Sequence, residues 1–312
     1  MGGITSKFRY KVLSEYIKKF DLVLFGETKL QKIPQSEFPD FDILSLKQKT
    51  RLHGLSILIK KERFKYTKKL NTKSKSVLWL LLGTSESNVN LIVGSVYVPG
   101  YDSKFADPND FDLICEDTLT LHEKYNTPFL LMGDFNSRTG NHTDHSDPLN
   151  LQVTIPPRYN MDKKVDTYGR KLLKMCMDLN LKIINGRYGS DCGVGSFTCH
   201  KKNRGALNES VVDYCITSED ILPCIADFYV DSFDKCMSDV HSPICIDITN
   251  VPTVKNTQKI SNENCETLLY KPGWKPESKA AYINSFSEND IMQVAENISD
   301  PTNLSKPNKT GY

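Results

Sequence analysis

The sequence predicts a layered domain of the α/β or α+β class, not an all-helical protein. Short apolar runs of strand length recur between residues 21 and 248, and only a few of the intervening segments have helical periodicity. Several of these runs end in an acid, an amide or a histidine. The many strands and their polar ends indicate a sheet-based fold in which strand termini carry the function.

The first half of the chain starts with a helix and continues with strands. Residues 9–20 carry apolar side chains at helical spacing. Further apolar runs predict strands at 21–26, 55–59, 77–82 and 91–98, and a helix is predicted over 108–125.

The second half repeats this alternation and then changes character. A helix over 165–179 places Leu172, Cys176 and Leu179 on one face. Strands are predicted at 129–132, 181–184, 211–217, 225–231 and 241–248. From residue 250 to residue 312 the chain is rich in Asn, Ser, Lys and Pro, with one possible helix over 279–298. We therefore expect a folded domain over 1–249 and a tail or linker over 250–312.

The composition fits one large globular core. Of the 312 residues, 39% are hydrophobic and 25% are charged, which is an ordinary balance for a folded protein. The net charge of +2 does not by itself predict nucleic-acid binding, because counterion-driven affinity depends on clustered Lys and Arg. The basic stretch from Lys60 to Lys75 fits either a solvated hairpin or a nucleic-acid contact.

Cysteine usage and the first residues indicate the cellular environment. The nine cysteines are an odd number and contain no Cys-x-x-Cys pair, so neither a disulfide scaffold nor a zinc ribbon is favoured. The start of the chain lacks the apolar core of a secretory signal, and no window has the roughly 20 apolar residues of a membrane span. We expect an intracellular protein of the nucleus or cytoplasm that is not secreted and does not enter a membrane.

The most informative motif is the apolar run 129–132 that ends in Gly133-Asp134-Phe135-Asn136. Gly133 permits a sharp turn or a close backbone approach. Residues two apart on an extended segment point the same way, so Asp134 and Asn136 could meet one phosphate, water or metal ion. The alternative interpretation is a simple Asx turn after a strand.

Other polar groups end other predicted strands. A set of such groups is expensive to bury unless a metal ion or a substrate compensates them. Their number is therefore more informative than any single member. The further residues of this kind are Glu27, Tyr97, Asp213, Asp239 and His241.

The motifs resemble, in order, those of the endonuclease/exonuclease/phosphatase superfamily, which has the fold of deoxyribonuclease I and the apurinic endonucleases. The resemblance covers about residues 3–249, and within the superfamily the chain is most similar to the endonuclease domain of non-LTR retrotransposons. The motifs that carry it are Gly26-Glu27-Thr28-Lys29, Tyr97-Val98-Pro99, Gly133-Asp134-Phe135-Asn136, Thr167-Tyr168-Gly169-Arg170, Ser196-Phe197-Thr198-Cys199, Val211-Val212-Asp213-Tyr214 and Ser238-Asp239-Val240-His241.

The resemblance implies a four-layer α/β sandwich, with two packed mixed β-sheets flanked by helices. It also implies hydrolysis of phosphodiester bonds in DNA, dependent on Mg²⁺ with Mn²⁺ as the alternative cation, and nicking of one strand as the retrotransposon-type task. Two alternatives stay open: a catalytically impaired remnant that only binds nucleic acid, and a small-molecule phosphoesterase of the same fold.

The resemblance assigns the metal and the attacking water to one group of residues. Glu27 and Asp239 would hold the metal, since a hard cation prefers carboxylate oxygen. Asp134 would orient or deprotonate the water, and Asn136 would hold the same water or a phosphate oxygen. Asp239 would also complete the catalytic cluster.

A second group would contact the phosphate and the DNA. His241 is expected at the scissile phosphate, with Asp213 on its other ring nitrogen and Tyr97 donating to the phosphate or leaving group. The expected contacts to the DNA backbone are Thr198 and the loop residues Lys201, Lys202 and Arg204.

The chain departs from the family in two ways. The family normally begins with a strand that carries an Asn, and the chain starts too late to include it, so we expect a fold without its first strand and a weakened site. Val240 also separates Asp239 from His241, which are adjacent in the family. The segment from Trp274 to Glu277 resembles a linker to reverse transcriptase, the partner module expected in a full-length element.

Overall fold

The computed structural model describes residues 6–30, 32–46, 54–85, 87–145, 155–203, 205–249, 251 and 254–255. These residues belong to a compact unit of Met1–Lys259. The tail predicted over 250–312 and its helix over 279–298 lie outside the described residues, apart from residues 251, 254 and 255. Among the described residues, no helix has the length and apolar character needed to cross a bilayer.

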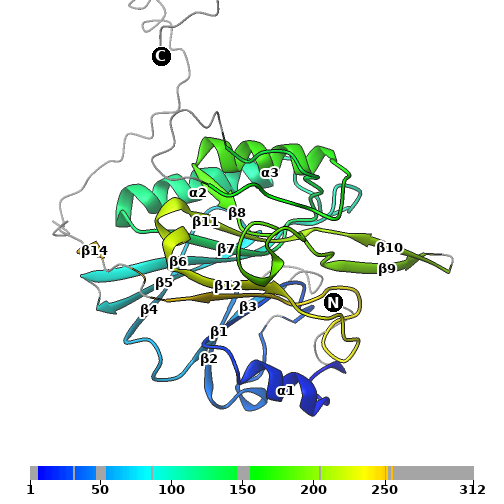
Figure 1. Cartoon of the computed structure of the whole chain (residues 1–312). Helices are drawn as coiled ribbons and strands as arrows, with labels where there is room; N and C mark the ends of the chain where they lie inside the picture. The colour runs from blue at the N-terminus through cyan, green and yellow to red at the C-terminus, as the bar shows by residue number, and fades with distance from the viewer. Residues whose placement is uncertain are drawn as a thin grey trace, which may run out of the picture. The chain divides into compact units, whose positions relative to one another are not determined.

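One large mixed sheet forms the centre of this unit (Figure 1). Its strand order is β4-β5-β6-β7-β11-β8, with β14 paired to β6. Strands β6 and β7 run parallel, and the other neighbours are antiparallel. The strands are β4 (Tyr66–Leu70), β5 (Val77–Ser85), β6 (Asn88–Tyr97), β7 (Phe129–Asp134), β8 (Leu181–Ile183), β11 (Asp213–Ser218) and β14 (Val254–Lys255).

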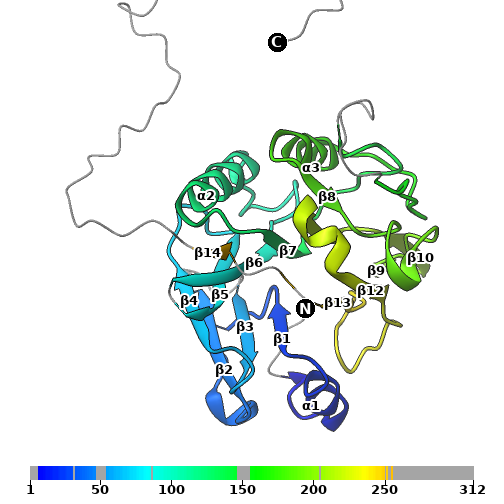
Figure 2. The ribbon, with the colours of Figure 1, turned by 60° about the vertical axis from the view of Figure 1, so that its left-hand side comes forward.

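A second strand layer consists of two smaller sheets. One has the order β1-β3-β2, and the other is the antiparallel pair β12-β13. Figure 2 shows both below the large sheet, on the side away from helices α2 and α3. Their strands are β1 (Leu22–Phe25), β2 (Phe41–Leu46), β3 (Leu55–Lys60), β12 (Ile225–Val230) and β13 (Ile244–Ile248).

Helices cover both outer faces and complete four layers. Helix α1 (Lys11–Ile17) packs on the β1-β3-β2 sheet, and α2 (Asp110–Tyr125) and α3 (Thr167–Asp178) pack on the large sheet. Each interface between layers has its own apolar core. Trp79 belongs to the core under α2 and α3, Leu80 to the core between the two strand layers, and Leu58 to the core under α1. The predicted four-layer α/β sandwich is confirmed. Short 3₁₀ helices occur at Gln35–Glu37, Gly189–Asp191 and Glu219–Cys224.

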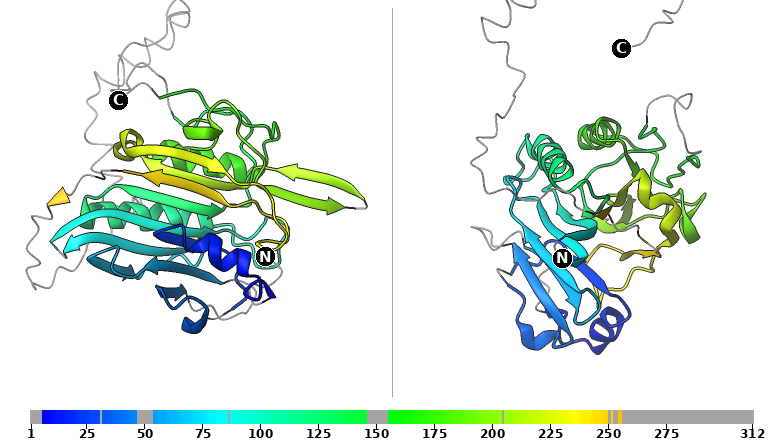
Figure 3. Two further views of the ribbon diagram at one scale, coloured as in Figure 1. Left: turned by 60° about the horizontal axis from the view of Figure 1, so that its bottom comes forward. Right: turned by 90° about the vertical axis from the view of Figure 1, so that its left-hand side faces the viewer.

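The segment around Lys201 is a hairpin and not the predicted loop. Strands β9 (Cys199–Asn203) and β10 (Ala206–Ser210) pair with each other and project from the rest of the unit (Figure 3). Their sequences are polar and lack apolar alternation, so the hydrophobic pattern gave no strand signal. Strands β2 and β4 were also not predicted, and β4 forms part of the basic stretch.

Candidate active site

Three predicted residues lie side by side at the ends of neighbouring strands. Tyr97 of β6 is the register partner of Asp134 of β7, and Asp213 of β11 is the register partner of Asp134 on its other side. Directly opposed residues point to the same face of a sheet. The large sheet therefore presents a phenol and two carboxylates in a row.

His241 joins this row from the segment that precedes β13. Its Nδ1 lies 2.8 Å from Oδ2 of Asp213, and its Nε2 lies 3.8 Å from Oδ2 of Asp134. Burial alone would lower the pKa of His241, but the charge of Asp213 and its hydrogen bond outweigh burial and raise the pKa to about 9. The imidazole is therefore protonated at neutral pH, and Asp213 holds its Nδ1.

Asn136 fixes the carboxylate of Asp134. The backbone N–H of Asn136 donates to Oδ1 of Asp134 at 2.8 Å, and its Nδ2 donates to Oδ2 at 3.0 Å and to the Val98 carbonyl at 2.8 Å. Asn136 has a φ of 46°, a left-handed conformation that Asn tolerates better than most residues. Burial, reinforced by the nearby Asp213, raises the pKa of Asp134 to about 7.

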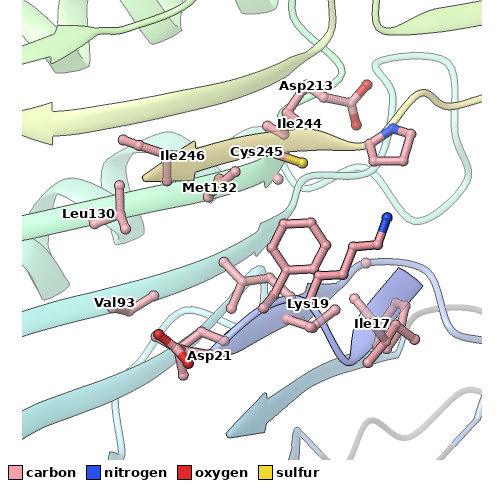
Figure 4. A pocket seen from close by; sticks show the side chains of 18 of the residues that line it. Ile17, Lys19, Asp21, Val93, Leu130, Met132, Asp213, Ile244, Cys245 and Ile246 are labelled. Carbon is pink, nitrogen blue, oxygen red and sulfur yellow. The ribbon is translucent and has the colours of Figure 1, made fainter. Parts of the chain in front are cut away.

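Glu27 approaches the row from the other strand layer, directly beyond β1. A hydrogen bond links Glu27 to Tyr97, and burial together with the Glu27 charge raises the pKa of the Tyr97 phenol. One cavity of about 660 Å³ is lined at its polar end by Glu27, Tyr97, Asp134, Asp213 and His241. Five of the predicted residues thus face one space, part of which is seen in Figure 4.

Asp239 occupies a different position from these five. Its Oδ1 pairs with Nζ of Lys7 at 2.8 Å, and its side chain is 43% exposed. It does not line the cavity and is not among the residues that group tightly as possible metal ligands. Val240, which separates Asp239 from His241, does not line the cavity either, and its carbonyl accepts the His200 N–H at 2.7 Å.

The donors at the polar end fit a divalent cation at Glu27 better than at the tightest cluster. The atoms of Asp134, Asp213 and His241 that could bind a metal lie within 4.8 Å of one another. Within this cluster, Nδ1 of His241 is already engaged by Asp213 at 2.8 Å. Glu27 offers a partly exposed carboxylate of the kind that a hydrated Mg²⁺ prefers.

The residues expected to contact DNA have divergent surroundings. Lys201 and Lys202 are exposed on β9, and the charge of Lys201 acts on Asp134, so this hairpin lies near the polar end of the cavity. Arg204 lies outside the described residues. Thr198 is fully buried, and its Oγ1 accepts N–H bonds from Val212 at 3.1 Å and Asp213 at 3.0 Å. This burial corrects the expected phosphate contact of Thr198: the side chain holds the Asp213 backbone instead.

Asn185 also positions Asp213 and is not among the residues predicted from the sequence. Its Nδ2 donates to the Asp213 carbonyl at 3.1 Å, and its Oδ1 accepts the Cys215 N–H at 2.9 Å. The side chain is buried, so these bonds also satisfy its amide. A signal was present, because Asn185 is an amide directly after the predicted strand 181–184, the same pattern that identified Asn136.

Solved nuclease structures share the architecture of this chain. The endonuclease domain of TRAS1, a telomere-specific non-LTR retrotransposon, is 16% identical with a TM-score of 0.52, covering 78% of this chain and 91% of that one. A 3′-5′ exonuclease from Neisseria meningitidis is 16% identical with a TM-score of 0.54, and the match covers 79% of this chain and 96% of that one. An AP endonuclease from Leishmania major is 12% identical with a TM-score of 0.56, and the match covers 80% of this chain and 85% of that one.

These likenesses establish the fold of the chain. It is the deoxyribonuclease I-like fold of the endonuclease/exonuclease/phosphatase proteins, as the motifs predicted. No protein-family model matches the sequence, and no curated protein matches it significantly.

Proposed function

We propose that this chain is a metal-dependent nuclease that hydrolyses a phosphodiester bond in DNA and nicks one strand. The single observation that carries the proposal is the arrangement of Asp134, His241 and Asp213 around one space. It combines a carboxylate fixed by Asn136 with a protonated imidazole fixed by Asp213. The carboxylate can accept a proton from the attacking water, and the imidazolium can stabilise negative charge on the phosphate. Hydrolysis of a phosphodiester requires both of these tasks.

The geometry supports a distinct task for each side chain. Asp134 accepts a proton from a water whose oxygen forms a bond to phosphorus, while the bond from phosphorus to the leaving sugar oxygen breaks. Nε2 of His241 donates to a phosphate oxygen, because Nδ1 is occupied by Asp213. The Tyr97 phenol, kept protonated by its raised pKa, is a candidate proton donor to the leaving oxygen.

Mg²⁺ or Mn²⁺ fits the carboxylates that remain. Glu27 would hold the cation, and Asp239, the second predicted ligand, would have to leave its ion pair with Lys7 to join it. Such a cation would neutralise the charge that develops on the phosphate.

A DNA substrate is supported by two observations. The exposed lysines of the β9–β10 hairpin lie near Asp134 and can meet phosphates without reading bases. Solved proteins with this fold include a retrotransposon endonuclease and an AP endonuclease. A retrotransposon-type nick and a reverse transcriptase partner are the finer forms of this proposal.

The test is nicking of supercoiled plasmid by the purified full chain, with Mg²⁺, with Mn²⁺ and with EDTA. We expect nicking that EDTA abolishes and that Asp134→Asn lowers by about 10²–10⁴-fold. The control Asp178→Asn makes the same charge change at an exposed ion pair on α3 and should keep full activity.

Each alternative function has its own outcome in the same assay. Salt-sensitive DNA retention without cleavage in any metal would identify a binding remnant. Faster turnover of inositol phosphates than of DNA would identify a small-molecule phosphoesterase. Equal nicking by Asp134→Asn and the unaltered chain would refute the assigned chemistry.

A further inference from the structure

His241 lies in an irregular segment between β12 and β13 and not in a strand. Among the described residues, its backbone forms one isolated bridge, with Cys199 at the start of β9. Its N–H donates to Oγ of Ser238 at 3.1 Å, and its ring is held through Nδ1 by Asp213. A residue outside a regular ladder keeps its place only through contacts of this kind. The groups that hold its two neighbours in the sequence therefore help to place the imidazole.

His200 of β9 contacts both of these neighbours. Its backbone N–H donates to the Val240 carbonyl at 2.7 Å, and Nε2 of its ring lies 3.1 Å from Oγ of Ser242. The backbone N–H of Ser242 also donates to the Thr198 carbonyl at 2.8 Å. The chain before and after His241 is thus fastened to the start of β9, and one of the fastenings is the side chain of His200.

The ring of His200 is itself fixed on its other side. Its Nδ1 lies 2.8 Å from Oε1 of Glu209, which is its register partner on β10. The ring also packs on Phe233, with the centroids 5.2 Å apart and the planes at 30°. Phe233 belongs to the same irregular segment as His241. The imidazole of His200 therefore braces this segment at two points, Phe233 and Ser242.

Glu209 determines how the ring of His200 meets Ser242. A carboxylate only accepts hydrogen bonds, so Nδ1 of His200 carries a hydrogen. Nε2 then accepts from the Ser242 hydroxyl when the ring is neutral and donates to it when the ring is charged, because a hydroxyl can do both. The contact between His200 and Ser242 is therefore compatible with either charge state of the ring.

A serine, a histidine and a carboxylate in hydrogen-bonded series also occur in serine hydrolases, as nucleophile, base and orienting acid. That chemistry needs N–H groups beside the serine that stabilise an oxyanion. The Ser242 N–H is already donated to the Thr198 carbonyl, and Pro243 has no N–H. His200 does not line the cavity, whereas His241 does. The series is therefore suited to holding Ser242 in place and not to activating it.

We propose that His200 is a positioning residue for His241. It holds Ser242, and through Ser242 it keeps the imidazole of His241 against Asp213 and beside Asp134. This role rests on the proposed nuclease function, in which Nε2 of His241 donates to the phosphate. It gives the β9–β10 hairpin a second task besides DNA contact, one that acts through the protein and not through the DNA.

The neighbouring lysines provide the contrasting case. Lys201 and Lys202 follow directly and are exposed, whereas the side chain of His200 is only 17% exposed. A residue that contacts phosphate contributes to DNA affinity, so its loss raises KM and changes the salt dependence of binding. A residue that orients His241 contributes once DNA is bound, so its loss lowers kcat and leaves KM unchanged.

Two substitutions separate the two hydrogen bonds of the ring. In His200→Asn the amide reaches about as far as Nδ1, so Glu209 keeps a donor and Ser242 loses its partner. In His200→Gln the amide reaches about as far as Nε2, so Ser242 keeps a donor and Glu209 loses its own. The side chain of Glu209 is 33% exposed, so water can replace the lost bond, whereas Ser242 is buried. Only the asparagine variant should therefore release the segment.

The kinetic test is nicking of supercoiled plasmid by the full chain with Mg²⁺. We expect His200→Asn to lower kcat by about 10–100-fold without raising KM. Ser242→Ala removes the same contact from its other end and should lower kcat similarly, and the double variant should be no slower than either single one. His200→Gln should keep most of the rate. The matched control is His122→Asn, the same change at an exposed histidine of α2, and it should keep full activity.

A second readout does not require catalysis. NMR of ¹⁵N-histidine-labelled protein detects the Nδ1–H proton of His241 that Asp213 holds, and saturation transfer measures how fast this proton exchanges with water. We expect exchange about tenfold faster in His200→Asn and in Ser242→Ala, and unchanged exchange in His122→Asn. An inactive chain with this pattern would count against the nuclease function alone, because the imidazole would still depend on His200 for its position.

Three results would each overturn the role of His200. Unchanged exchange of the His241 proton in His200→Asn would show that the segment does not depend on this ring. A raised KM with unchanged kcat would make His200 a DNA contact. Equal loss of kcat in His200→Gln and His200→Asn would assign the effect to Glu209 or Phe233 and not to Ser242. Ser242→Ala leaves the hairpin intact and decides the same question if His200→Asn does not fold.

Discussion

The hydroxyl of Thr198 accepts the backbone N–H of Asp213 at 3.0 Å, and the same oxygen accepts the N–H of Val212 at 3.1 Å. Asp213 in turn holds Nδ1 of His241 at 2.8 Å. A fully buried hydroxyl therefore fixes the strand end that fixes the imidazole.

Removal of this hydroxyl should destabilise the fold. Thr198→Val leaves two buried N–H groups without their acceptor, and we expect a loss of about 2 kcal/mol or more in the free energy of unfolding. Thr198→Ser keeps the oxygen and should recover most of it. The matched control is Thr217→Val, because the buried Thr217 hydroxyl has no partner among the described residues. Urea unfolding measures all three; equal losses at both threonines would contradict this role.

Neutralising Asp213 should lower the pKa of His241. The charge and hydrogen bond of Asp213 are what raise that pKa to about 9 against the opposing effect of burial. In Asp213→Asn both contributions are reduced, and we expect a pKa below about 7, near the ordinary value for histidine. An NMR pH titration of the His241 ring measures it. Asp178→Asn serves as the control, and an unchanged titration in Asp213→Asn would show that other groups set this pKa.

The buried pair of Asp144 and Arg187 should make the free energy of unfolding depend on pH in the acidic range. Asp144 accepts bonds from Arg187 at 2.8 and 2.7 Å and from the Ile183 N–H at 2.7 Å. Burial alone would raise the pKa of Asp144, but these bonds and the Arg187 charge hold it well below its usual range. A lowered pKa contributes stability above the unfolded value of about 3.9, and this contribution is lost as the pH falls toward the folded value.

Asp144→Asn should therefore cost about 3–5 kcal/mol at pH 7, since it leaves a buried guanidinium without its charge partner. The difference in unfolding free energy from the unaltered chain should shrink at pH values below about 4. Urea unfolding over a pH series measures this difference. The exposed pair of Lys174 and Asp178 is the control, and Asp178→Asn should cost at most about 0.5 kcal/mol. A pH-independent difference for Asp144→Asn would contradict the linkage.

Gly133 should not tolerate a side chain. Its φ is 145°, and a Cβ atom there would lie 2.1 Å from the Val96 carbonyl oxygen, which is backbone and cannot move aside easily. We expect Gly133→Ala to cost about 3 kcal/mol or more. At Gly193, φ is 75° and nothing lies within 4 Å of the added atom, so Gly193→Ala should cost only about 1–2 kcal/mol. Thermal unfolding compares the two, and similar losses would argue against the close approach at Gly133.

The hairpin lysines should contribute to DNA affinity without sequence preference. Replacing Lys201 by Ala should weaken binding at every sequence and lower the slope of log K against log salt by roughly 0.9, the value for one phosphate contact. Lys124→Ala, in the last turn of α2, is the control. Fluorescence anisotropy at several salt concentrations gives both slopes. An unchanged slope for Lys201→Ala would remove the hairpin from the interface.

The local sequence was sufficient for the buried elements and the polar strand ends. Strands such as β5 and β7 are apolar runs that leave few other options, and Asp134, Asn136 and Tyr97 were recognised because polar residues ended such runs. The β9–β10 hairpin was missed because both strands are exposed and polar, so hydrophobic periodicity carries no information there.

Only the tertiary structure decided how these residues act together. Sequence spacing cannot reveal that Thr198 is buried beneath Asp213, or that Asp239 pairs with Lys7, because these contacts join segments far apart in the chain. The order β1-β3-β2 depends on strand pairing between separate segments in the same way. Local side-chain chemistry thus determined which residues could react, and long-range packing determined which of them meet.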